Sequence, residues 1–295
     1  MNSDRATIAL PPRHIAMGKA LGRSWPLVLG LAALALPTMV SLGEQFWSRE
    51  EGAHGPIVLA TGGWLLWRQF PPMERDRQPS RGWLVAALLG IALSLYVFGR
   101  AYDFLSLEVS ALYGIGLILL YDRFGAVALR RNWFPCLYLA FAIPAPGWLI
   151  DRLTAPLKHF VSYAATEGLQ MVGIPIFREG VTLYITRYQL LVEDACSGLN
   201  SIVGLLALGL FYIFVLRRAS PAYSLALTAL ILPVAVTANL IRIVILVLLT
   251  YYFGDGVAQG FLHLAAGMVL FMISLLLIFG IDALLSAGRT HDRAA

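Results

Sequence analysis

Polar side chains that can do chemistry are concentrated in one short stretch of the chain, VEDACSGLNSIVG at residues 192–204. A thiol at the start of a helix faces the positive end of the helix dipole, which favours the nucleophilic thiolate. Cys196 has such a position, because an apolar run typical of a helix follows it directly. A lone cysteine is often only a small buried hydrophobe, but this one has polar neighbours. They are Glu193, Asp194, Ser197, Asn200 and Ser201.

Two further polar residues stand in the apolar segments that follow. Arg242 lies in TANLIRIVIL three residues after Asn239, so the two share one face of a predicted helix. His263 lies in GFLHLAAGMVLF, one or two turns inside the next predicted helix. A histidine can activate a thiol or protonate a leaving amine, and an arginine can stabilise the oxyanion formed when a thiolate attacks an amide. The trio with Cys196 therefore predicts cysteine peptidase or transpeptidase chemistry.

Each polar residue also has a structural interpretation. Arg242 can form an ion pair with Asp194 or Glu193, which would hold the guanidinium in place and does not exclude a catalytic role. His263 can simply bond a backbone carbonyl inside the membrane. The second cysteine, Cys136, stands among apolar residues without polar neighbours, so we expect it to serve packing alone.

The composition places these residues in a membrane protein. Of the 295 residues, 59% are hydrophobic and 13% charged, and the mean hydropathy is +0.74. A soluble domain carries about 25% charged residues. We expect an all-α polytopic membrane protein, with eight spans of about 20 residues each, the length that a bilayer core requires. The expected spans are 25–43, 54–70, 83–100, 103–121, 130–149, 196–216, 222–251 and 257–285.

The basic residues predict the orientation of these spans, because cytoplasmic loops carry an excess of Lys and Arg. With the N-terminus inside, most of the 22 lysines and arginines fall on the inner side. Residues 1–24 and 286–295 are then cytoplasmic segments, and 25–285 form one membrane domain. The first span follows a basic segment, but it lacks a convincing signal-peptide cleavage site. The basic residues left on the outer side are Arg49, Arg100, Arg152, Lys158, Arg178 and Arg187.

This orientation puts residues 150–195 outside, where a partner peptide can dock. Residues 151–172 have apolar side chains at helical spacing and predict a helix lying at the outer interface, with a re-entrant segment as the alternative. Residues 181–192 are rich in β-branched and aromatic residues and predict a small hairpin that turns near Thr186–Gln189. Cys196, Arg242 and His263 are then expected at the same outer level.

In the order and type of these residues, the chain resembles the exosortase/archaeosortase family of membrane cysteine transpeptidases. The resemblance is carried by ACSGLNS around Cys196, ANLIR ending at Arg242 and HLAAG beginning at His263. Further matching segments cover most of residues 50–285 in the family's order. They are HGPIVLATGGWLLWR at 54–68, IPAPGWLIDRLTAPLKHFVS at 143–162 and VGIPIFREG at 172–180.

The resemblance implies an enzyme that sorts exported proteins. Such enzymes recognise a C-terminal tail made of a short motif such as Pro-Glu-Pro, a transmembrane helix and a basic cluster. Cys196 would be the nucleophile, His263 the acid/base and Arg242 the oxyanion stabiliser, at the outer face of the cell inner membrane. The implied partners are these exported proteins, the lipid bilayer and an exopolysaccharide or lipid acceptor. Neither nucleic acid nor a metal or other cofactor is expected.

The resemblance also assigns supporting residues. His54, at the outer start of the second span, would line the same site, or else be an ordinary interfacial loop histidine. Asn239 would orient Arg242. Glu193 and Asp194 would support the site by hydrogen bonds or restrain the thiolate by repulsion, and Ser197 would stand beside the thiol. Many relatives carry an arginine where this chain has Asn200, which leaves the subfamily and the tail motif open.

Other classes of protein make different predictions. A transporter that uses Arg242 as an intramembrane site would show inverted repeats and charges at the midplane, and the sequence has no such repeat. A thiol oxidoreductase would need a CxxC motif or two outer cysteines, whereas Cys136 is expected on the inner side of its span. A non-enzymatic assembly factor for polysaccharide export would make Cys196 dispensable.

Overall fold

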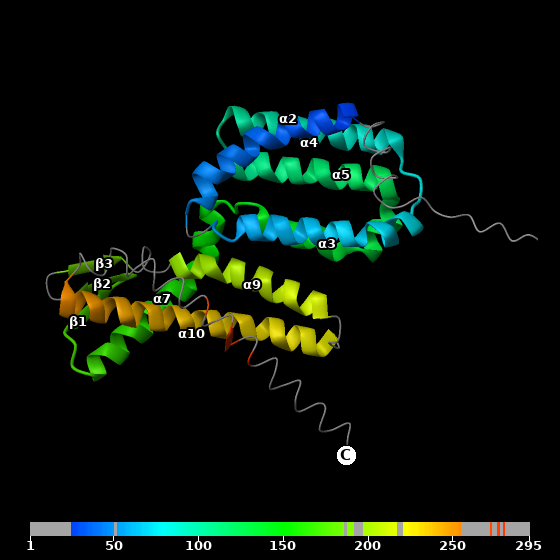
Figure 1. Ribbon diagram of the computed structural model, residues 1–295. Helices are drawn as coiled ribbons and strands as arrows, with labels where there is room; N and C mark the ends of the chain where they lie inside the picture. Colours follow the sequence, from blue (N-terminus) through cyan, green and yellow to red (C-terminus); the bar gives the residue numbers. More distant parts are fainter. Residues whose placement is uncertain are drawn as a thin grey trace, which may run out of the picture.

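The chain is mostly helical, and its long helices run side by side with a small β-sheet at one end (Figure 1). We call this the sheet end. The computed structural model describes residues 25–49, 52–185, 188–191, 197–216, 221–254, 272, 276, 277 and 280. The elements in chain order are α2 Trp25–Leu42, η1 Gly43–Trp47, α3 Gly55–Arg75, α4 Gly82–Ala101, α5 Leu105–Arg131, α6 Trp133–Leu139, η2 Ala140–Ala142, α7 Gly147–Met171, β1 Ile176–Glu179, β2 Thr182–Ile185, β3 Tyr188–Leu191, α9 Ser197–Leu216 and α10 Pro221–Phe253.

The expectation of a helical polytopic membrane protein is confirmed. Among the described residues, four helical segments are long and apolar enough to span a bilayer, and the bent pair of α6 and α7 would be a fifth. The four are Trp25–Trp47, Gly82–Ala101, Leu105–Arg131 and Ala229–Phe253. The eight expected spans stay a prediction. Helix α3 covers one of them but carries polar and charged residues in its second half, and most of 257–285 lies outside the described residues.

An elbow separates α6 from α7. The chain turns by 91° between Trp133–Ala142 and Gly147–Met171. The sequence of the elbow, IPAP at 143–146, explains the break, because Pro144 and Pro146 have no backbone N–H to continue the helical ladder. Helix α7 confirms the helix predicted over 151–172. The bend fits both a helix lying along the membrane surface and a re-entrant segment, so the choice between these two predictions stays open.

The sheet is a three-stranded antiparallel meander in the order β1-β2-β3. Strands β2 and β3 pair with Thr182 opposite Leu191 and Ile185 opposite Tyr188, which confirms the hairpin predicted over 181–192. Its turn residues 186–187 lie outside the described residues. Strand β1 was not predicted. It joins the sheet through a register that sets Ile176 opposite Ile185.

Helix α10 connects the helices to the sheet. Near its start Ile231 and Ala235 form a buried cluster with Leu205 of α9. Farther along, Ile243, Leu246 and Val247 are buried in a second cluster. The α7 and sheet residues of that cluster are Val161, Ala165, Leu169, Ile176, Leu183 and Ile185. One helix therefore packs on α9 over its first part and on α7 and the sheet over its second (Figure 1).

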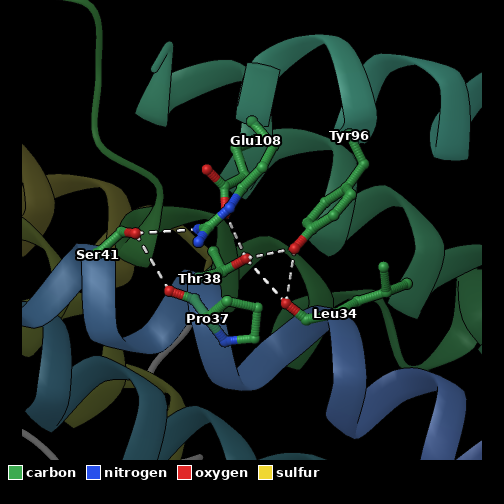
Figure 2. Close-up of polar contacts among 7 residues, drawn as sticks. Leu34, Pro37, Thr38, Ser41, Tyr96 and Glu108 are labelled. Atoms are coloured by element: carbon green, nitrogen blue, oxygen red, sulfur yellow. Dashed lines mark hydrogen bonds and ion pairs between the residues drawn. The ribbon is translucent and has the colours of Figure 1, made fainter. Parts of the chain in front are cut away.

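A buried polar cluster, which we call the Glu108 cluster, joins α2, α4 and α5 (Figure 2). Glu108 is only 3% exposed, and its Oε1 accepts from Thr38 Oγ1 at 2.7 Å and from Arg100 Nη1 at 3.0 Å. Tyr96 lies 3.1 Å from the Thr38 hydroxyl and donates to the Leu34 carbonyl at 2.8 Å. A buried carboxylate is tolerated only with such partners, so the cluster fixes the three helices to one another.

Candidate active site at the sheet end

The structure describes only part of the predicted site. Arg242, Asn239 and His54 lie in described segments, and the backbones of Ser197 and Asn200 form the first turn of α9. Four predicted site residues lie outside the described residues, so their arrangement stays a prediction. They are Glu193, Asp194, Cys196 and His263.

Arg242 faces the protein interior. Its side chain is 2% exposed and that of Asn239 is 3%, whereas Ile241 between them is 46% exposed. The spacing of three residues thus puts the guanidinium and the amide on the buried side of α10, as the sequence predicted. An arginine inside an apolar helix is costly in lipid, and burial among protein groups removes that cost.

The packing of α9 on α10 fixes the level of Arg242. A Cβ atom on Gly209 would lie 2.5 Å from Ile231 Cδ1, so these two residues stand opposite each other on antiparallel helices. Arg242 is eleven residues beyond Ile231, and eleven residues back from Gly209 is position 198. Since both helices rise by about 1.5 Å per residue, Arg242 is level with the first turn of α9, immediately after Cys196 in the sequence.

His54 contacts α9 from the side of α3. It precedes the first residue of α3. A Cβ atom on Gly204 would lie 3.2 Å from the Cβ of His54, so the histidine packs directly on the α9 backbone two turns inside Ser197. Its Nε2 lies 3.3 Å from the carbonyl oxygen of Phe141 in η2. His54 therefore joins α3, η2 and α9 at the sheet end.

This arrangement favours an anion at the start of α9. The N-terminus of a helix carries a partial positive charge and unsatisfied N–H groups. The buried guanidinium of Arg242 adds a full positive charge at the same level. A thiolate, or the oxyanion of a tetrahedral intermediate, would be stabilised by both. Within the described ranges, no group of three or more His, Cys, Asp or Glu residues is arranged to hold a metal ion.

Cys136 has a different environment. It lies half-buried in α6, and its backbone carbonyl accepts a 2.6 Å hydrogen bond from the Tyr113 hydroxyl of α5. The neighbouring Phe134 and Tyr138 belong to the buried cluster between α3, α6 and α9. These contacts agree with the packing role expected from the sequence.

The Glu108 cluster is a polar site that the sequence reasoning missed. A signal was present, because Glu108 is the acidic residue of the first turn of α5 and Arg100 is the basic residue of the last turn of α4. Charged residues at the ends of two consecutive apolar helices indicate a pair. The sequence does not show that Thr38 and Tyr96 would join them.

Comparison with known families matches residues 47–280 to a family described as transmembrane exosortase (Exosortase_EpsH). The matched range begins at the end of η1 and includes α3 to α10, with the sheet and the helix α9 that follows residue 196. No curated protein and no solved structure gives a significant match to the chain.

Proposed function

The chain belongs to the transmembrane exosortase family, and from that membership we propose that it is a cysteine peptidase or transpeptidase acting on exported proteins. The substrate is the C-terminal sorting tail, in which a short motif precedes a transmembrane helix and a basic cluster. That helix presents the motif laterally, from within the bilayer. The product is either released or transferred to an exopolysaccharide or lipid acceptor.

In the proposed reaction the thiolate of Cys196 attacks the carbonyl carbon of the scissile peptide bond. A C–S bond forms, and the carbonyl electron pair moves to oxygen, where Arg242 stabilises the oxyanion. Collapse of this intermediate breaks the C–N bond while His263 protonates the leaving amine, which carries the tail helix. Water or an acceptor nucleophile then attacks the thioester and loses its proton to His263. The C–S bond breaks, which restores the thiolate of Cys196 and the protonated His263.

The observation that supports this mechanism most directly is the buried Arg242. The guanidinium is 2% exposed and level with the first turn of α9, directly after Cys196 in the sequence. A buried cation at this level can stabilise the oxyanion of the intermediate. We assign Asn239, three residues before Arg242 and equally buried, to orienting the guanidinium. Ser197 and Asn200 would contribute polar groups from the first turn of α9, and Glu193 and Asp194 would hold Arg242 or restrain the thiolate.

The distribution of basic residues supports an orientation with the sheet end outside. Both termini would be cytoplasmic, with residues 1–24 and 286–295 flanking a membrane domain at 25–285. The active site then faces the outer side of the cell inner membrane, where exported proteins arrive. No nucleic acid takes part.

The test is the C-terminal sequence of surface and secreted proteins from cells that carry either the parent protein or Cys196→Ala. We expect a set of proteins to keep its motif, helix and basic tail only in the variant, which would also identify the motif. Cys136→Ala is the matched control and should process every tail. If Cys196→Ala accumulates normally and leaves all C-termini unchanged, the thiol mechanism is wrong, and an assembly factor or a transporter becomes the better interpretation.

A further inference from the structure

The elbow between α6 and α7 leaves one backbone carbonyl without its helical partner. In a helix, the oxygen of Phe141 would accept from the N–H of residue 144 or 145. Pro144 has no N–H, and the chain turns away before Ala145. An unsatisfied carbonyl costs most where water is scarce, as at the end of a membrane helix. The oxygen of Phe141 therefore needs a donor from elsewhere in the protein.

His54 is in position to supply that donor. Its Nε2 lies 3.3 Å from the oxygen of Phe141. A carbonyl only accepts, so Nε2 carries the hydrogen of this bond and donates it. The ring also stands edge-to-face against Phe46 of η1, with ring centroids 6.4 Å apart. These contacts hold the imidazole from the side of α3, η1 and η2.

The remaining side of His54 rests on α9. His54 packs closely on Gly204, because a Cβ at position 204 would stand 3.2 Å from the Cβ of His54 and would force it to shift by a few tenths of an ångström. Gly204 is two turns along α9 from its first residue, and a helix segment of this length is stiff. Any shift of His54 relative to α9 is therefore passed on to the start of that helix.

We propose that His54 is a positioning residue, which locks the elbow against α9 and so sets where the start of α9 stands relative to Arg242. The proposal rests on the proposed function for the role of Cys196, and it assigns to His54 no contact with substrate. Helix α10 packs on α9 from one side through Ile231 and Ala235. From the other side α3 and α6 pack on Ala207, Phe211 and Phe214 of α9. His54 adds a contact at Gly204, which is nearer to the start of α9 than those three residues.

The position of a nucleophile affects the rate of reaction more than the affinity for substrate, because misplacing reacting atoms by about 1 Å costs up to a hundredfold in rate. The proposal thus predicts a loss in kcat with little change in KM. It also predicts that the hydrogen-bond donor of His54 matters, since the donor holds the elbow.

The experiment compares His54→Phe with His54→Gln in a Cys136→Ser background, where Cys196 is the single cysteine. Phenylalanine keeps the ring and loses the donor, and glutamine keeps an N–H donor. Two readouts are taken in detergent, namely kcat and KM on a synthetic tail peptide, and the rate at which iodoacetamide alkylates Cys196. His291→Phe, in the expected cytoplasmic segment 286–295, is the matched control.

We expect His54→Phe to lower kcat about fivefold or more with KM within about twofold, as loss of one positioning hydrogen bond implies. The alkylation rate should change in the same variant, while His54→Gln and His291→Phe stay close to the parent. Equal defects in His54→Phe and His54→Gln would overturn the proposal, as would a lower thermal stability with kcat and alkylation unchanged. If the parent cleaves no tail, the proposed function fails, and the alkylation rates still decide whether His54 positions Cys196.

Discussion

Replacing Arg242 by lysine separates a catalytic arginine from a structural one. The side chain is 2% exposed and level with the first turn of α9. Lysine keeps the positive charge on a shorter, flexible stem but loses the planar fork of donors. If Arg242 stabilises an oxyanion, the lost geometry affects the transition state while the charge in the interior is preserved.

The expected size of the effect follows from the burial of Arg242. Removal of one positioned oxyanion donor lowers kcat by about 10²–10³ in enzymes where it has been tested. Water does not compensate for the loss at a site this enclosed, so we expect Arg242→Lys to lie in that range with KM almost unchanged. Arg242→Met leaves any buried acidic partner uncompensated, and breaking a buried ion pair costs about 3–5 kcal/mol of stability.

The assay pairs cleavage of a synthetic sorting-tail peptide with thermal unfolding of the same detergent-solubilised sample. Arg100→Lys is the matched control. Arg100 also lies at the sheet end and binds a carboxylate, but it is 43% exposed and belongs to the Glu108 cluster, away from α9. The control should keep kcat within about twofold, because a partly exposed ion pair contributes little.

Two results would refute the reasoning. If Arg242→Lys cleaves at the parent rate, the fork geometry of the guanidinium is not used in the transition state. If Arg242→Lys loses stability and activity together and Arg242→Met does the same, the arginine is a structural ion-pair partner. Only a stable Arg242→Lys protein with a low kcat agrees with an oxyanion role.

Three further predictions concern the scaffold. Thr38→Val removes the hydroxyl that donates a hydrogen bond to Glu108. It should lower the stability of the protein in detergent unfolding by about 1 kcal/mol, the size of an interhelical hydrogen bond in membranes. Unchanged stability would mean that this hydrogen bond does not hold the helices together. Gly125→Ala should cost about 3 kcal/mol by the same measurement, because Gly125 has φ +81° and its Cβ would stand 2.5 Å from the Gln78 carbonyl oxygen; a smaller loss than in Thr38→Val would contradict this. Cys136→Ser should keep full cleavage activity, and a loss of activity at normal stability would make Cys136 part of the chemistry.

The sequence predicted those elements whose signal is local. Apolar spacing alone predicts the helix that became α7, and alternating β-branched and aromatic residues predict the β2–β3 pair. The inward direction of Arg242 follows from the cost of a cation in lipid. Strand β1 has no such signal, because two of its residues, Arg178 and Glu179, are charged. It is a strand because its backbone pairs with β2, which is a tertiary contact.

The contacts of the candidate site were beyond sequence reasoning for a similar reason. That His54 comes directly before a helix is readable from the chain, but its bond to Phe141 joins residues 87 positions apart. Once the turn is known, the prolines of the elbow show that the Phe141 carbonyl lacks a helical donor. Which other donor binds this carbonyl depends on how α3 packs against η2, and no sequence pattern within either segment predicts that packing.

The charged residues of the described helices lie at different depths. Arg100 and Glu108 lie at the sheet end of α4 and α5, and Arg130 and Arg131 lie in the last turn of α5, at its opposite end. Arg242 is level with the start of α9, and it lies near the middle of Ala229–Phe253, the part of α10 that is long and apolar enough to span a bilayer. A transporter also places charged groups near the midplane, where its substrate binds. The depth of Arg242 therefore fits both functions, and the C-termini of exported proteins in cells with Cys196→Ala distinguish peptide-bond cleavage from transport.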